Sequence, residues 1–214
     1  MRTTILATLL LLLCTSCWGS RRLSDPTLLV RGETGQELGV STDYGVVFLG
    51  HAVQSGYVEV TAWFGDGPSI ESSVVEPIGG GLYTAETEIR LPYVPISFEP
   101  PYPGQEVQVI GRDSQSRWTG VAIVREDPAV LGFLLEPSPE LFLDDSQVGA
   151  GVFIGEEGHE QLLGLVSGRI RITDEESGQR EYLTVVGAEE LWRLVTHRTD
   201  QGARRPFVYR QDIL

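Results

Sequence analysis

The sequence predicts an all-β fold, and three observations support this. Short apolar runs, several with the two-residue alternation of half-buried strands, recur from Gly45 onward. Turns rich in glycine and proline separate these runs about every 8–12 residues, a spacing typical of β-barrels and β-sandwiches. Only residues 188–197 have a convincing helical pattern. Periodicity alone does not distinguish a barrel from a sandwich.

In the first half of the chain, the run 57–64 alternates most clearly. The turn signal at 65–68 predicts that the chain reverses there, and Gly79, Gly80 and Gly81 predict a second sharp turn. Prolines 100, 101 and 103 cannot lie in a central strand, because proline lacks the N–H that a strand ladder needs. They predict a connector at 99–104. Expected strands in this half are 45–49, 57–64, 70–75 and 86–91.

In the second half, the same criteria predict more strands and then one helix. Leu191, Leu194 and Val195 are spaced for one face of a helix at 188–197. Glu189 and Glu190 fall in its first turn, where the helix dipole favours acids. We expect a polar, arginine-rich tail at 198–214. Expected strands are 106–111, 118–124, 131–135, 151–154, 161–166, 169–173 and 182–186.

The N-terminus has the features of an export signal. Arg2 precedes an apolar run at 5–13, which is too short for a transmembrane helix of roughly 20 residues. Small residues then lead to Cys17, in a pattern that resembles a bacterial lipobox. We expect a signal peptide at 1–16, acylation of Cys17, and a tether at 17–41 with room for one edge strand. The alternative is ordinary secretory cleavage, which would give a periplasmic or secreted protein.

The charge of the chain limits its partners. Its 30 acidic residues outnumber 16 basic ones, all arginine, for a net charge of −14. Such a surface repels phosphate backbones, so we expect no nucleic-acid binding. It also lacks a polybasic segment for anionic lipid, so membrane attachment would depend on the acyl chains alone. Both cysteines lie in the first 17 residues, so the mature domain has no disulfide to stabilise it.

The stretch 149–153, Gly-Ala-Gly-Val-Phe, enters an apolar strand, and a polar turn leads to a second strand that ends at Ser167 and Gly168. This layout resembles the nucleophile loop of trypsin-like, chymotrypsin-fold serine proteases, in particular the bacterial Deg-type branch. Residues 45–53 are similar to the strand and loop that hold the family's catalytic histidine. The resemblance implies two six-stranded β-barrels, at 42–98 and 105–197, with the C-terminal helix closing the second and an active site between them.

The resemblance also implies a catalytic triad, in which a serine attacks the carbonyl, an imidazole takes its proton, and a carboxylate orients the imidazole. His51 falls at the histidine position. The aligned nucleophile position holds Val148, which has no nucleophilic atom, and Gly149 and Ala150 continue the oxyanion loop. The sequence is therefore degenerate at the catalytic serine.

Two tentative substitutes lie nearby. Ser146 follows Asp145, as the family's serine follows an aspartate, but it lies two residues too early. The carboxylate position aligns with Ala85, and the adjacent Glu86 could replace the aspartate. Each candidate also has a structural explanation: His51 as a solvated loop histidine, Glu86 as an outward acid on an edge strand, and Ser146 as part of a solvated acidic loop.

Three interpretations follow. The first is an exported, lipid-anchored protease homologue with impaired catalysis that binds a peptide or an envelope protein. The second is an active serine endopeptidase that uses Ser146 and His51. The third is an unrelated β-sandwich lipoprotein. We expect no cofactor, because His51, His159 and His197 lack metal-ligand spacing, and no peptide-binding module of the Deg type after residue 214. The sequence does not predict an oligomeric state.

Overall fold

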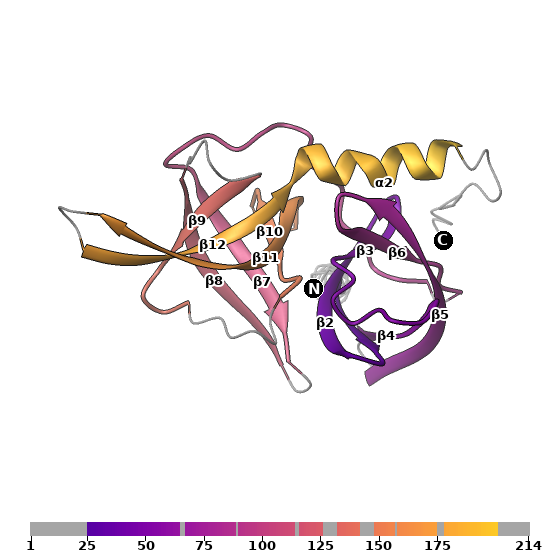
Figure 1. The fold of residues 1–214 in the computed structure, drawn as a ribbon. Coiled ribbons are helices and arrows are strands. Elements are labelled where there is room, and N and C mark those ends of the chain that lie inside the picture. Colours follow the sequence, from indigo (N-terminus) through magenta and orange to yellow (C-terminus); the bar gives the residue numbers. More distant parts are fainter. Residues whose placement is uncertain are drawn as a thin grey trace, which may run out of the picture.

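The computed structural model describes residues 25–64, 67–88, 90–113, 116–125, 132–141, 148–156, 158–174 and 178–200. Within these residues, the strands form two closed antiparallel barrels of six strands each, and one helix follows the second barrel (Figure 1). The predicted all-β, two-barrel architecture with a C-terminal helix is confirmed, and the closed barrels rule out a β-sandwich. In this part of the chain, no helix is both long and apolar enough to cross a bilayer.

The first barrel has the strand order β1-β2-β3-β6-β5-β4, so β3 pairs with β6 as well as with β2. The second has the order β10-β11-β12-β9-β8-β7. The strands of the first barrel are β1 (Thr27–Gly32), β2 (Gly35–Thr42), β3 (Gly45–Phe48), β4 (Tyr57–Phe64), β5 (Gly67–Gly79) and β6 (Leu82–Ala85). The second contains β7 (Glu106–Arg112), β8 (Arg117–Arg125), β9 (Phe133–Pro137), β10 (Gly151–Ile154), β11 (Gln161–Asp174) and β12 (Gly178–Gly187), followed by helix α2 (Ala188–Asp200).

The predicted tether at 17–41 is wrong from Thr27 onward, where the first barrel begins. Strands β1 and β2 pair along their whole length, and β1 also pairs with β4 to close the barrel. The sequence pattern did not predict strand β2, because both faces of this strand are buried. Its apolar Leu38 and Val40 pack between the barrels, whereas the intervening positions are Glu37, Gly39 and Ser41. A buried strand with small and polar residues does not show the alternation of a half-exposed one.

Two other predicted strands also need correction. The strand expected at 86–91 is wrong, because β6 starts at Leu82, directly after the glycine turn, and ends at Ala85. The separate strand expected at 169–173 is the continuation of β11, which runs unbroken to Asp174. A bulge between Val166 and Gly168 shifts its register with β12 and hides the continuity in the sequence.

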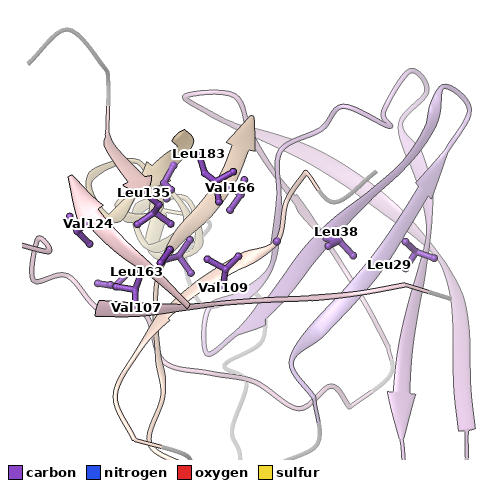
Figure 2. Close-up of a cluster of buried hydrophobic side chains, with 13 residues drawn as sticks. Leu29, Leu38, Val107, Val109, Val124, Leu135, Leu163, Val166 and Leu183 are labelled. Atoms are coloured by element: carbon purple, nitrogen blue, oxygen red, sulfur yellow. The ribbon is translucent and has the colours of Figure 1, made fainter. Parts of the chain in front are cut away.

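The barrels share a buried apolar interface. Leu29 of β1 and Leu38 of β2 belong to the same cluster as core residues of the second barrel, and Figure 2 shows these two side chains on the first-barrel side of it. Each fully buried leucine contributes roughly 1.5–3 kcal/mol. Beside the cluster, Arg112 lies 4.2 Å from the centroid of the Trp63 ring and 3.1 Å from Asp25. The barrels are therefore held in one arrangement by packing and by polar contacts.

Helix α2 leaves the second barrel and lies over the first (Figure 1). Its Leu191 and Leu194 are fully buried, in a cluster with Val47 of β3 and Leu82 of β6. In its last turns, His197 lies 2.9 Å from Glu76, and Arg198 donates to the carbonyl of Tyr44. The helix thus ties the end of the second barrel to the first.

Candidate functional site

His51 lies in the exposed loop between β3 and β4, which the sequence predicted as the histidine loop. The loop is anchored on the β1–β2 hairpin, where the Thr34 hydroxyl donates to the His51 carbonyl at 3.0 Å. Gly50 has a φ of +78°, and a Cβ there would lie 2.1 Å from the Tyr83 ring of β6. Only glycine therefore fits at this position, and the close packing fixes where His51 leaves the barrel.

The most unusual group beneath this loop is Glu37 of β2, which is only 1% exposed. One of its carboxylate oxygens accepts the Leu49 N–H at 3.0 Å, and the other accepts the Ala52 N–H at 2.8 Å. These two amides flank His51 in the sequence. Both oxygens of one buried carboxylate therefore hold the histidine loop in place. The sequence interpretation missed Glu37, although an isolated acid among small and apolar residues was a possible signal.

Burial raises the pKa of the Glu37 carboxyl above its ordinary value of 4.5, since desolvation penalises the charged form. The backbone amides, Ala52 first, and the charge of His51 act in the opposite direction without cancelling the effect of burial. A buried carboxylate is costly, even when it is hydrogen-bonded. In this structure the buried Glu37 carboxylate fixes the geometry of the loop around His51.

The second-barrel half of the site is the loop at 148–150 that enters β10. The carbonyl of Val148 accepts the Leu38 N–H at 2.8 Å. Its side chain packs against the apolar cluster that includes Val40 and Phe153, and is only partly exposed. An apolar side chain here can be shielded from water, but it supplies neither a nucleophile nor a proton donor.

Gly149 lies where the loop at 148–150 contacts β2. Its φ is +90°, and a Cβ would lie 2.0 Å from the Leu38 carbonyl oxygen, so only glycine allows the loop to approach β2. The Gly149 N–H donates to the Val166 carbonyl at 2.8 Å, and the Ala150 carbonyl accepts the Val166 N–H at 2.9 Å. These two hydrogen bonds fix the loop at 148–150 to β11.

Two consecutive residues of β2 bring both halves together. Glu37 holds the loop of His51, and Leu38 is bonded to Val148. The predicted histidine position and the predicted nucleophile position therefore meet at one strand of the first barrel, as the two-barrel resemblance implied.

The structure does not bring Glu86 to this site. Strand β6 pairs with β3 so that Tyr83 lies opposite Phe48 and Ala85 opposite Val46. The histidine loop follows Phe48, so Glu86 lies at the other end of β6, roughly 10 Å along the strand from Tyr83. Its side chain is 65% exposed and faces Arg198 at 3.8 Å. Glu86 is therefore an outward acid, but it follows the end of β6 and does not lie on an edge strand.

Ser146 and Cys17 lie outside the described residues, so their geometry remains a matter of prediction. Among the residues that the structure describes, no group of three or more histidine, cysteine, aspartate or glutamate side chains could hold a metal ion.

Strand β11 continues past its pairing with β10. That pairing ends at Leu165, whereas the pairing with β12 runs on to Asp174. Val166, the next residue after Leu165, bonds to Gly149 and Ala150 of the loop at 148–150. The edge of a strand can bind an extended peptide through main-chain groups.

Comparison with known proteins agrees with this architecture. The MamO protease domain from Magnetospirillum magneticum is 17% identical, with a TM-score of 0.58 over 83% of this chain and 97% of that one. The serine endoprotease from Yersinia pestis is 14% identical, with a TM-score of 0.58 over 85% of this chain but only 65% of its own. The inactive form of the Rv3671c protease of M. tuberculosis H37Rv is 18% identical, with a TM-score of 0.56 over 80% and 88%.

No family model matches the sequence, and no curated protein matches it. At 13–18% identity, the structural similarities show the fold alone. The chain therefore has the fold of the chymotrypsin-like serine proteases.

Proposed function

We propose that this protein is an exported, lipid-anchored protease homologue with impaired catalysis, which binds an extended peptide or a segment of an envelope protein between its barrels. The observation that carries the proposal is Val148. It occupies the position that the resemblance gives to the nucleophile, and its side chain packs against an apolar cluster. A chymotrypsin-type mechanism needs a hydroxyl or thiol there.

Two further features support binding without cleavage. Glu86, the sequence candidate for the orienting carboxylate, faces Arg198 instead of His51. Strand β11 extends beyond its pairing with β10, and a peptide that adds to a strand edge is bound through main-chain groups, which requires no catalytic residue.

The catalytic half of the proposal is tested by labelling the mature protein with a fluorophosphonate probe, beside Ser146→Ala and His51→Ala variants. We expect no labelling of the folded wild-type protein. Labelling that disappears in both variants would establish a Ser146–His51 pair and an active endopeptidase, contrary to the proposal.

The binding half is tested with peptides selected from a random display library and measured by calorimetry. We expect backbone N-methylation at alternate peptide residues to abolish binding, because it removes the N–H groups that would pair with β11 while leaving the side chains intact. Peptides that bind equally well when N-methylated would contradict strand addition.

A further inference from the structure

Four exposed aromatic side chains lie between the barrels in sequence or on the terminal helix. Tyr93, Phe98, Tyr102 and Trp192 are between 39% and 65% exposed. The first three lie on the connector, which in the structure comprises the residues between β6 and β7, and Trp192 lies early in α2. We call Phe98 and Trp192, whose rings are in contact, the aromatic patch. The only other strongly exposed aromatic residue of the described part of the chain is Tyr57, on β4.

The aromatic patch is held by a rigid base. The rings of Phe98 and Trp192 meet edge to face, with their centroids 5.1 Å apart. Beneath them, Val94 and Ile96 of the connector are buried in the same cluster as Leu191 of α2. Prolines on the connector restrict its backbone further. These aromatic side chains are therefore presented to the outside at little cost in conformational entropy.

The N-terminal segment enters the fold beside this patch. The Pro26 carbonyl accepts the Ser41 N–H at 2.8 Å, and the Ser41 carbonyl accepts the Val94 N–H at 3.0 Å. Both bonds are made by one residue of β2, whose N–H and C=O point to the same side, so Pro26 and Val94 lie next to each other on the same edge of this strand. Phe98 of the patch follows Val94 by four residues, roughly 14 Å at most.

From this arrangement we propose that the aromatic patch seats the protein on the surface of a lipid bilayer. The inference rests on the lipid anchor at Cys17 that we proposed above. Eight residue steps join Cys17 to Asp25, so an acylated Cys17 would hold the fold within roughly 28 Å of the bilayer. The part of the molecule nearest to the anchor must then face the lipid, and this part carries the patch.

The residue types fit a bilayer interface. Tryptophan and tyrosine collect at the boundary of membrane and water, where an apolar ring can be buried while its polar atom stays hydrated. Insertion of these rings has an affinity of its own for the bilayer. It adds to the attachment by the acyl chains and fixes the orientation of the fold.

The charged side chains near the aromatic patch indicate which lipid headgroups it would contact. Glu99 and Glu189 adjoin the patch in sequence, and Glu190 is paired with Arg193 one turn along the helix. With a net charge of −14, the protein as a whole repels anionic headgroups. The surface therefore suits a zwitterionic interface.

The test is flotation of the mature chain without acyl groups, residues 18–214, which retains both barrels and α2. Vesicles of phosphatidylcholine are compared with vesicles that also contain phosphatidylglycerol. The patch variant is Phe98→Gln with Trp192→Gln. The matched control is Tyr57→Gln with Ile70→Gln, since these two side chains are more exposed than those of the patch and lie on the paired strands β4 and β5 of the first barrel. Circular dichroism confirms that each variant is folded.

We expect the wild type and the control to float with phosphatidylcholine vesicles, and the patch variant to partition roughly tenfold less. Phosphatidylglycerol should weaken wild-type flotation. No flotation of the wild type, or an equal loss in both variants, would overturn the proposal and point to a protein partner for the patch. Acylation of Cys17 is measured separately from the intact mass of the exported protein, so its absence would refute the anchor without being confused with the flotation result.

Discussion

The two barrels share one topology but differ in what they bury. The described strands of the first barrel bury six polar side chains, Thr27, Glu37, Ser41, Thr42, Ser73 and Thr84, and those of the second bury none. Glu37 illustrates the consequence of this difference, because its carboxylate holds the loop of His51. The second barrel instead supplies the apolar side chain of Val148.

A two-barrel protease needs reactive groups from both halves. In the described residues, the first barrel supports the loop of His51 with a buried carboxyl group. The second barrel presents Val148, which has no nucleophilic atom, on the loop at 148–150. Under the proposed function both loops serve binding, and the following variants test this contrast.

The largest effect should come from Val148→Ser. The new hydroxyl would lie on the loop that meets β2 next to the support of His51, so we expect labelling by a fluorophosphonate where the wild type shows none. Labelling should be slow, since loss of the orienting carboxylate alone costs roughly 10⁴-fold in serine proteases. The control is His51→Ala in the Val148→Ser background. Labelling that persists in this double variant would mean that His51 does not serve the site.

Gly149→Ala should destabilise the junction between the barrels by about 2–4 kcal/mol, because the methyl group would clash with the Leu38 carbonyl and the backbone has a positive φ. Gly178→Ala is the matched control. Gly178 also has a positive φ, of +76°, but nothing lies within 4 Å of its Cβ position. The control should cost about 1 kcal/mol. Urea unfolding measures both, and equal losses would contradict a tight junction at Gly149.

Glu37→Ala should cost about 1–3 kcal/mol, since it leaves the Leu49 and Ala52 amides buried without an acceptor. Hydrogen exchange at these two amides should accelerate more than exchange at Val109 in the second barrel. Unchanged exchange at Leu49 and Ala52 would show that the loop is fixed by packing alone.

The Glu37 carboxyl also predicts a pH dependence. Its pKa is raised in the folded state, so the stability it contributes is fully present below the unfolded value of about 4.5 and is lost as the pH rises through the folded pKa. Relative to Glu37→Gln, the wild type should therefore become less stable on going from pH 4 towards neutrality. Chemical denaturation at several pH values measures the difference. The opposite slope would mean that the amide hydrogen bonds outweigh desolvation.

The smallest effect should come from Glu86→Gln. An exposed ion pair such as that with Arg198 contributes about 0–1 kcal/mol. Because Glu86 lies at the far end of β6, the NMR chemical shifts of the His51 ring should not change. A change in these signals in the Glu86→Gln variant would instead identify Glu86 as a partner of His51.

Much of the secondary structure in the second half of the chain could be predicted from the sequence. The helix follows from the spacing of Leu191, Leu194 and Val195, and the hairpin of β10 and β11 from two apolar runs around a polar turn. These elements bury one regular face, and a regular face leaves a periodic pattern. The connector followed from its prolines, whose lack of an N–H is a local property.

The secondary structure of the first half was harder to predict, because its pattern of polar and apolar residues depends on contacts between residues far apart in the sequence. Strand β2 looked like a tether, since its polar Glu37 and Ser41 are buried inside a barrel and its apolar residues meet the other barrel. The role of Glu37 depends on amides 12 and 15 residues away in the sequence. No local pattern encodes such a contact.

The sequence by itself determined the all-β class, the division at the connector, the terminal helix, and the valine at the position where the resemblance expects a serine. Only the tertiary structure decided that both barrels close, that β1 and β2 belong to the first, and that Glu37 and Leu38 place the loops of His51 and Val148 side by side. The physical reason is the distance in sequence between the residues that interact. Alternation, turns and helix ends are written in neighbouring residues, whereas barrel closure and the burial of a carboxylate depend on residues that are brought together by folding.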